Sequence, residues 1–185
     1  MRFNNHWQVD GKHAFLGASK YHWIRYDLDK MKSIWSNKFA SERGTRLHKF
    51  AAEAIRLKIR MPRNDITINK YINDAIGFRM TPEQVLYYNE DCFGTPDAIS
   101  FEKRVLRIHD LKTGVHPGSF DQTKIYCALF CLEYNINPYD IEMIMRIYQS
   151  DLVFEEIADP AQIKEIMETI VLFTKEIENM REVME

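Results

Sequence analysis

The sequence predicts a mixed α/β domain in which helices flank a central sheet. Segments with strand character alternate with helical segments in the order helix, strands, helix, strands, helix, which is typical of a sheet covered by helices. The last helical segment carries an apolar stripe that suits packing against a sheet. A chain of 185 residues with 45% hydrophobic content can bury one sizeable core. We therefore expect a single domain over residues 1–185, with residues 1–36 as an N-terminal extension packed on it.

The first half of the chain is expected to be mainly helical. A turn motif favours a hairpin within residues 1–16, and a short helix should follow at residues 19–23. A long helix is expected from Asn37 or Ser41 to about Met61, where a proline follows and stops it. A short helix and a loop are then expected at residues 64–80, and residues 81–84 are expected to cap a further turn with Pro82 at its first position.

The middle of the chain predicts strands. Residues 85–89 are rich in aromatic and aliphatic side chains. Residues 94–101 and 105–114 also have strand character, and the polar turn at residues 102–104 between them predicts a hairpin. Two further strands are expected at residues 141–148 and 152–157.

Two helices are expected after the hairpin. Residues 115–119 predict a loop, in which Ser119 should cap a helix that starts near Phe120. The dipeptide Asp159-Pro160 should start the last helix. The residues expected to face the core are Ile125, Leu129 and Leu132 in the first of these helices and Ile163, Ile166, Met167, Ile170, Phe173 and Ile177 in the second.

A carboxylate and a lysine are expected to lie side by side at the end of the hairpin. Side chains alternate along a strand, so Asp110 and Lys112 project from one face, while His109 and Leu111 project from the other. Asp97 on the preceding strand joins this group if the hairpin register brings it opposite Asp110.

Two polar side chains of the following helix are expected to point toward this group. Gln122 and Tyr126 are four residues apart and therefore share one face of the helix. Two converging acidic groups repel each other unless a cation lies between them, and hard oxygen ligands suit Mg²⁺ or Mn²⁺. Such a metal polarises a phosphoryl oxygen and lowers the pKa of a bound water, while Lys112 can orient that water or neutralise developing charge. The chemistry predicted for these residues is phosphodiester hydrolysis.

An ordered set of motifs carries a family resemblance over most of the chain. The set comprises Gly94-Thr-x-Asp97, Asp110-x-Lys112-Thr-Gly114 and Gln122-x-x-x-Tyr126, preceded by Ala18-Ser-Lys-Tyr-His-Trp23 and Gly44-Thr-Arg-Leu-His48. This order resembles the PD-(D/E)XK nuclease superfamily, and specifically its RecB-like branch, which includes lambda-type and CRISPR-associated exonucleases and nucleases carried by bacteriophages. The Asp-x-Lys pattern alone occurs by chance in most proteins, whereas the ordered set is much more specific.

The resemblance implies a PD-(D/E)XK nuclease-like core and metal-dependent hydrolysis of DNA, in recombination, repair or phage DNA processing. It favours an exonuclease over an endonuclease, although no residue shows recognition of a DNA end. The expected catalytic residues are Asp97, Asp110, Lys112, Gln122 and Tyr126. The expected ligands of one or two Mg²⁺ or Mn²⁺ ions are His48, Asp97, Asp110 and the backbone carbonyl of Leu111.

His48 has two interpretations. It lies at the edge of the apolar stripe of the long helix, where a lone histidine is usually a structural residue. In the RecB-like branch, however, a histidine at the end of a Gly-x-x-x-His pattern resembles an extra metal ligand, and Gly44 and His48 have that spacing. The resemblance favours the ligand, bound through a neutral imidazole.

The alternative functions are an endonuclease, a non-cleaving binding module and a hydrolase of small phosphoesters. An endonuclease would carry the same residues. A module of the same fold that binds nucleic acid without cutting it would be expected to lack Asp97, Asp110 or Lys112, and all three are present. A hydrolase of small phosphoesters would be expected to have a glycine-rich phosphate cradle, which the sequence does not contain.

The charge distribution is compatible with DNA as a partner. The formal net charge of -2 is not that of a typical nucleic-acid-binding protein. Basic residues nevertheless gather between Lys38 and Arg63, whereas acidic residues dominate after Asp140. This basic segment predicts a helix face that tracks a phosphate backbone, or equally an ordinary solvated face. The residues expected to contact nucleic acid are Arg43, Arg46, Lys49 and Thr113.

The three cysteines, Cys92, Cys127 and Cys131, fit a reducing compartment. Some RecB-like relatives bind an iron–sulfur cluster through four cysteines, and three cysteines cannot supply that ligand set from one chain. We therefore expect no iron–sulfur cluster, and Cys127 and Cys131 are interpreted as small buried residues.

Partners and location can be predicted only coarsely. The aromatic residues Tyr21, Trp23, Tyr26 and Trp35 could stack on bases, although such residues more often form core or subunit contacts. The resemblance implies a homo-oligomer, and exposed aromatic side chains could contact a recombination partner protein. No apolar run reaches membrane-spanning length, and the N-terminus lacks the apolar region of a signal peptide. We therefore expect no membrane partner and a cytoplasmic location, in the host cytoplasm for a phage protein.

Overall fold

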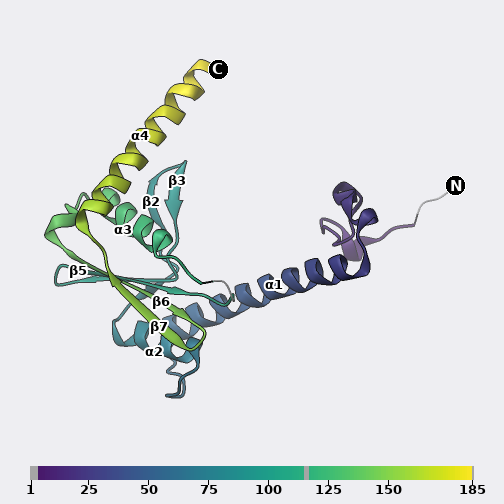
Figure 1. Ribbon diagram of the computed structural model, residues 1–185, viewed down its shortest axis with the longest axis horizontal. Coiled ribbons are helices and arrows are strands. Elements are labelled where there is room, and N and C mark those ends of the chain that lie inside the picture. The colour runs from purple at the N-terminus through teal and green to yellow at the C-terminus, as the bar shows by residue number, and fades with distance from the viewer. Residues whose placement is uncertain (1–3, 115–116, 185) are drawn as a thin grey trace. The chain divides into compact units, whose positions relative to one another are not determined.

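The computed structural model describes residues 4–114 and 117–184 and contains a five-stranded mixed sheet, here called the central sheet (Figure 1). Its strands, in spatial order, are β1 (Thr81–Pro82), β4 (Ala98–Glu102), β5 (Val105–Leu111), β6 (Glu142–Gln149) and β7 (Leu152–Ile157). The pair β5 and β6 is parallel, and the other pairs are antiparallel. A separate two-stranded sheet consists of β2 (Leu86–Asn89) and β3 (Cys92–Gly94). The predicted α/β class is confirmed.

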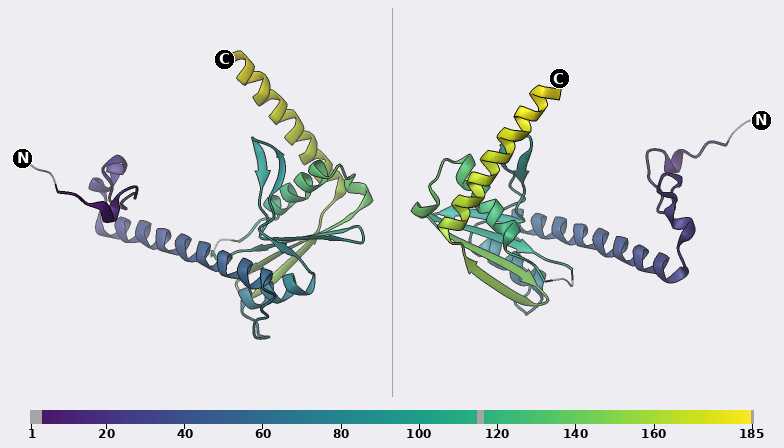
Figure 2. Two further views of the ribbon diagram at one scale, coloured as in Figure 1. Left: turned by 180° about the vertical axis from the view of Figure 1, so that it is seen from behind. Right: turned by 45° about the horizontal axis from the view of Figure 1, so that its top comes forward.

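The helices are α1 (Leu28–Arg56), α2 (Thr67–Gly77), α3 (Asp121–Glu133) and α4 (Pro160–Met184), with short 3₁₀ helices η1 (Trp7–Val9), η2 (Ala18–Arg25) and η3 (Pro138–Asp140). Figure 1 and Figure 2 show α3 and α4 over one face of the central sheet and α2, with the end of α1, over the other. Each face has its own core. Leu106, Ile108, Met143 and Met145 pack with α3 and α4, whereas Ala98, Leu111 and Tyr148 pack with α1 and α2.

The chain connects the parallel strands β5 and β6 through α3. Parallel neighbours need a crossover, and a helix in that crossover covers one face of the sheet. The segment before α3 includes residues 115 and 116, which lie outside the described residues, so the predicted loop at 115–119 is described only in part. Phe120 is the N-cap residue, and Ser119 Oγ accepts a hydrogen bond from the Asp121 N–H at 3.1 Å. The prediction that Ser119 is the cap is therefore wrong by one residue, although its hydroxyl still satisfies an N–H of the first turn from the position before the N-cap.

The hairpin predicted at residues 94–114 is confirmed as the antiparallel pair β4 and β5, which covers residues 98–111, with its turn at Lys103 and Arg104. Both turn residues have a left-handed backbone, with φ of 53° and 64°. This conformation matches the twist of the strands, although glycine or asparagine is usually found there. Ala98 lies opposite His109. Extending this register by one residue puts Asp97 beside Asp110, the arrangement on which the predicted site depends.

The long helix has different ends from those predicted. It begins at Leu28, because Asp27 Oδ1 accepts a hydrogen bond from the Lys30 N–H at 2.8 Å and so caps the first turn. It ends at Arg56, well before the predicted end, because Lys58 adopts a left-handed conformation with φ of 56° and closes the helix. Helix propensity alone did not indicate either cap.

Two further predictions of local structure are wrong. Residues 81–84 were expected to form a helical turn, but Thr81 and Pro82 form the edge strand β1, paired with Ile99 and Ala98. Pro82 is tolerated at this sheet edge, where no N–H is needed for a further strand. Among the described residues of the predicted N-terminal hairpin, 4–16, the structure has η1 and a turn but no strand.

Three predicted core residues are exposed. Ile125 is 43% exposed because the buried stripe of α3 runs along Thr123 and Cys127, on the other side of the helix. Phe173 and Ile177 are 62% and 37% exposed because they belong to the second half of α4, whereas in its first half Ile163 is buried and Ile166, Met167 and Ile170 are partly buried against the core. Figure 1 shows this end of α4 extending beyond α3 and the sheet.

The chain divides into two units, Met1–Glu42 and Arg43–Glu185. The second, here called the main unit, contains both sheets. In the first, the Phe15 and Trp35 rings meet edge to face at 4.8 Å, and Trp23 Nε1 donates to the Gly17 carbonyl at 3.0 Å. The packing of residues 1–36 on the domain stays a prediction.

Candidate active site

Asp97 lies where the main unit brings α1 against the start of β4. Its Oδ1 lies 2.9 Å from His48 Nδ1, and its Oδ2 accepts a hydrogen bond from the backbone N–H of Leu111 at 2.7 Å. A carboxylate only accepts hydrogen bonds, so His48 Nδ1 donates. The hydrogen bond to Asp97 is the main cause that raises the pKa of His48, against the opposing effect of burial. Asp97 is therefore held from two elements at once.

Asp110 is a buried carboxylate with one weakly satisfied oxygen. The residue is only 4% exposed. Lys112 Nζ donates to its Oδ1 at 3.2 Å and lies 3.0 Å from its Oδ2, but among the described residues Oδ2 has no hydrogen-bond partner of acceptable geometry. Burial, followed by repulsion from Asp97, raises the pKa of Asp110, while Lys112 opposes that rise. Asp110 is thus a carboxylate whose negative charge is only partly compensated.

Lys112 is tied to α3 by a chain of hydrogen bonds. Its Nζ donates to Gln122 Oε1 at 2.7 Å, and Gln122 Nε2 donates to Tyr126 Oη at 2.8 Å. Accepting through its oxygen and donating through its nitrogen fixes the orientation of the Gln122 amide. Burial raises the pKa of Tyr126, so its hydroxyl keeps its proton. Asp110, Lys112, Gln122 and Tyr126, predicted from their spacing, are joined in one network.

Glycines permit close approaches around this network. A Cβ on Gly44 would lie 2.7 Å from Thr113 Oγ1, so the absence of a side chain lets α1 come close to the end of β5. A Cβ on Gly94 would lie 2.8 Å from the Tyr126 ring. The glycines of the Gly-x-x-x-His and Gly-Thr-x-Asp patterns therefore set the distances at which His48 and Tyr126 reach the site.

The residues predicted to contact nucleic acid are exposed. Arg43, Arg46 and Lys49 lie on α1, and Thr113 follows β5 and lies against Gly44. This contact brings the basic part of α1 to the strand that carries Asp110. Whether these side chains bind a phosphate backbone stays a prediction.

The donor atoms fit a hard divalent cation, although the protein atoms do not form a closed metal cage. Among the described residues, no group of three His, Cys, Asp or Glu side chains is arranged to hold a metal ion. Asp97 and Asp110 are adjacent in the register of β4 and β5, and Asp110 Oδ2 is buried without a hydrogen-bond partner. Mg²⁺ commonly binds through one or two carboxylates and keeps several waters. The pair of carboxylates suits such a site, with His48 held to Asp97 in this arrangement.

Sequence reasoning did not single out Tyr71 of α2. The residue is 1% exposed, and its ring meets Tyr148 edge to face at 5.4 Å. Burial, followed by the negative charges of Asp97 and Asp110, raises its pKa. Its position at i and i+4 with Ala75 on a buried helix stripe indicates only a core residue, so the sequence held no signal for its proximity to the carboxylates.

Comparison with known proteins does not assign the chain to a family. No family model matches it, and it has no significant match among curated proteins or solved structures. None of the helices in the described part of the chain has both the length and the apolar character needed to cross a bilayer. Proposals about function therefore depend on the residues of the site.

Proposed function

We propose that the protein is a metal-dependent nuclease of the PD-(D/E)XK type that hydrolyses phosphodiester bonds in DNA. The observation that carries the proposal is the hydrogen-bonded network from Asp110 through Lys112 and Gln122 to Tyr126. It joins a strand to the helix that follows it, and it presents a buried carboxylate oxygen beside a fixed ammonium group.

Each residue has a role that follows from its contacts. Asp97 and Asp110 would hold Mg²⁺ or Mn²⁺, with the Leu111 carbonyl and His48 as further ligands. A divalent cation bound there supplies polarisation of the phosphoryl oxygen and a water of lowered pKa. The Lys112 ammonium orients the attacking water and stabilises negative charge on the phosphate as it develops.

Gln122 and Tyr126 act as positioning residues. A free lysine side chain samples many rotamers, and the hydrogen bond of 2.7 Å to Gln122 Oε1 restricts Lys112 to one of them. The Tyr126 hydroxyl accepts from Gln122, so its own proton is available to a phosphate oxygen. The network therefore fixes the ammonium before substrate binds, which is how preorganised charge lowers a barrier.

An exonuclease is favoured by the resemblance to RecB-like nucleases. An endonuclease would use the same residues, and cleavage of different substrates separates it from an exonuclease. A module that binds nucleic acid without cutting it would be expected to lack Asp97, Asp110 or Lys112, and binding without cleavage would identify it. A homo-oligomer and a recombination partner protein belong to the same proposal.

The test uses end-labelled linear DNA and closed circular DNA, each single- and double-stranded, with Mg²⁺, Mn²⁺ or EDTA. Lys112→Ala should lower kcat/KM by about 100- to 1000-fold, because it removes a charge that stabilises the transition state. DNA binding in EDTA should change by less than about threefold. Lys124→Ala is the matched control. Lys124 lies on α3 between Gln122 and Tyr126, but its ammonium pairs with Glu156 at 2.9 Å and not with the site.

The outcomes separate the alternatives. Metal-dependent shortening of linear DNA alone supports an exonuclease, and cutting of circles supports an endonuclease. Tight binding by the wild type without any cleavage favours the binding module. Near wild-type turnover by Lys112→Ala would show that Lys112 is not the catalytic lysine.

A further inference from the structure

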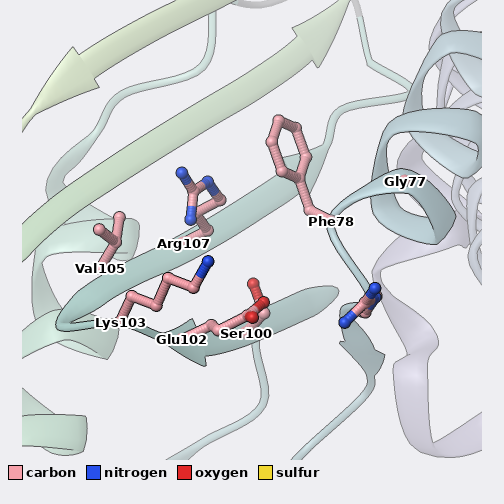
Figure 3. A pocket seen from close by; sticks show the side chains of 8 residues that line it. Gly77, Phe78, Ser100, Glu102, Lys103, Val105 and Arg107 are labelled. Atoms are coloured by element: carbon pink, nitrogen blue, oxygen red, sulfur yellow. The ribbon is translucent and has the colours of Figure 1, made fainter.

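A polar pocket lies on the face of the central sheet opposite Asp110 and Lys112, between the end of α2 and the β4–β5 hairpin (Figure 3). Its volume is about 340 Å³. Arg107 of β5 and His109 project from the face opposite Asp110 and Lys112, because side chains alternate along the strand. Arg107 and Asp110 are three residues apart, or about 10 Å along a strand. The residues that line the pocket include Phe78, Arg79, Ser100, Glu102, Lys103 and Arg107.

The pocket has an excess of positive charge. It gathers three cations, Arg79, Lys103 and Arg107, against the single carboxylate of Glu102. Among the described residues, none of these three cations forms an ion pair or a side-chain hydrogen bond with another residue. Figure 3 shows the nitrogen ends of Lys103 and Arg107 directed toward the same space above the hairpin. Unpaired cations that converge on one space favour an anion there.

A neighbouring arginine shows that the fold can neutralise such a charge. Arg146 lies over the Phe78 ring at 5.1 Å, and Arg107 lies over the same ring at 4.8 Å. Arg146 is paired with Asp74 at 3.2 Å and with Glu155 at 2.6 Å. Arg107 has the ring contact, which holds its guanidinium in place, but no carboxylate. The charge of Arg107 is therefore positioned and left available.

The backbone conformation accounts for how two of the cations reach the pocket. Arg79 and Lys103 both have left-handed backbones, with φ of 54° and 53°. This region favours glycine, and a residue with a Cβ is destabilised in it. At both positions a long cation replaces the favoured residue, and both cations line the pocket. The hairpin turn and the end of α2 therefore each place a long cation in the pocket lining.

We propose that this pocket is an anion-binding site that takes a phosphate group. The planar guanidinium of Arg107 and the ammonium of Lys103 can donate to different oxygens of a tetrahedral anion, and the Ser100 hydroxyl supplies a further donor. The phosphate could belong to a nucleic-acid strand or to a small ligand such as a mononucleotide. The site lies on the other face of the sheet from Lys112, and the inference does not rest on the proposed nuclease activity.

The experiment follows backbone amide signals of the ¹⁵N-labelled full chain in EDTA. Inorganic phosphate is titrated against sodium chloride of equal ionic strength. We expect saturable shifts of the Arg79, Lys103 and Arg107 amides that chloride does not reproduce. Arg107→Gln and Lys103→Gly should each weaken phosphate binding about tenfold, because a charge-assisted hydrogen bond is lost.

The control is Arg104→Gly, because Arg104 is also left-handed but donates through Nε to the Asp140 carbonyl at 2.8 Å, outside the pocket. It should leave the phosphate affinity within about twofold of wild type. Lys103→Gly should also raise Tm by about 2–4 °C through relief of backbone strain. Weaker binding by a more stable protein cannot result from unfolding.

Two further ligands identify the source of the phosphate. Tighter binding of the single-stranded oligonucleotide dT12 than of AMP, weakened by Arg107→Gln, indicates a nucleic-acid backbone. Tighter binding of AMP or inorganic phosphate indicates a small ligand. The proposal is overturned if phosphate shifts none of the three amides beyond the effect of chloride, or if Arg107→Gln binds phosphate as tightly as Arg104→Gly does. Because no cleavage is measured, these results are separate from the test of the nuclease.

Discussion

His109 and Asp110 are neighbours on β5, and they show how differently two buried titratable groups can behave. Their exposures are 0% and 4%. Among the described residues, each has one buried polar atom without a hydrogen-bond partner, Nε2 of His109 and Oδ2 of Asp110. Because they are consecutive, they point to opposite faces of the sheet. Burial and an unsatisfied atom are common to both, so neither feature by itself identifies a site.

The surroundings of His109 keep it neutral. Tyr148 Oη donates to Asp74 Oδ2 at 2.8 Å, so His109 Nδ1, 3.2 Å from that oxygen, carries the hydrogen that Tyr148 accepts. Burial, together with the positive charges of Arg146 and Arg107, lowers the pKa of His109 to about 3. The imidazole therefore carries no charge at neutral pH and contributes to packing.

Asp110 has the opposite surroundings. Burial and the negative charge of Asp97 raise its pKa, while Lys112 holds the charged form. Lys112 in turn contacts Gln122 on another element. The candidate site is thus distinguished by the negative charge of Asp110, which Lys112 compensates only in part. At His109, by contrast, the surroundings keep the buried side chain uncharged.

The largest expected difference between the two neighbours is in DNA cleavage. Asp110→Asn should lower cleavage about a thousandfold or more, because the carboxylate is lost from the proposed metal site. His109→Asn retains a donor toward Tyr148 and should cleave within about threefold of wild type. Rates on linear DNA with Mg²⁺ measure both effects.

Although Asp110→Asn should lower cleavage, it should raise the stability of the folded protein. A raised pKa means that the folded state disfavours the charged form of Asp110, so a neutral asparagine should raise Tm at neutral pH. An inactive Asp110→Asn that is also less stable would point to a structural role. Comparable losses of cleavage in both variants would remove the contrast between the two neighbours.

A smaller difference is expected in the pH dependence of folding. Because the folded pKa of His109 lies at about 3 and the unfolded pKa near 6.5, the unfolded state binds more protons between these values. The contribution of His109 to the free energy of unfolding is therefore complete above pH 6.5 and is lost as the pH falls toward 3. Between pH 7 and pH 5 the wild type should lose about 2 kcal/mol more than His109→Asn. Urea denaturation in EDTA at both pH values measures this difference, and parallel losses would mean that His109 titrates normally.

The smallest expected effect concerns the close contact between Gly44 of α1 and Thr113, which follows the strand that carries Asp110. Gly44→Ala places a Cβ 2.7 Å from Thr113 Oγ1 and should shift the end of β5, lowering cleavage about tenfold. Adding Thr113→Ala removes the clashing atom and should restore most of the rate. Gly77→Ala is the control in another helix, because nothing lies within 4 Å of its added Cβ. A double variant as slow as Gly44→Ala would place the cause elsewhere.

The sequence was sufficient to predict the parts of the site that depend on strand and helix periodicity. Alternation placed Asp110 and Lys112 on one face, and four-residue spacing joined Gln122 to Tyr126. These relations depend on local geometry alone. They therefore hold wherever the predicted element forms.

Features that depend on a single backbone conformation or on a distant partner could not be predicted. Lys58 and Arg79 end helices in a left-handed conformation that their residue types do not favour. Pro82 became part of a strand because the edge of β4 was available to it. The second half of α4 has an apolar stripe like that of the first, although only the first packs against the core. The excess of charge around Arg107 emerges only when α2 and the hairpin come together.

The contacts of the candidate site also differ widely in the length of chain that they close. Gln122 is 4 residues from Tyr126 and 10 from Lys112, and Leu111 is 14 from Asp97, whereas 49 residues separate His48 from Asp97. Closing a longer loop has a larger entropic cost, and local contacts tend to form first. We therefore expect the lysine network to assemble within the hairpin and α3 early in folding, and the His48 contact to form last, when α1 docks.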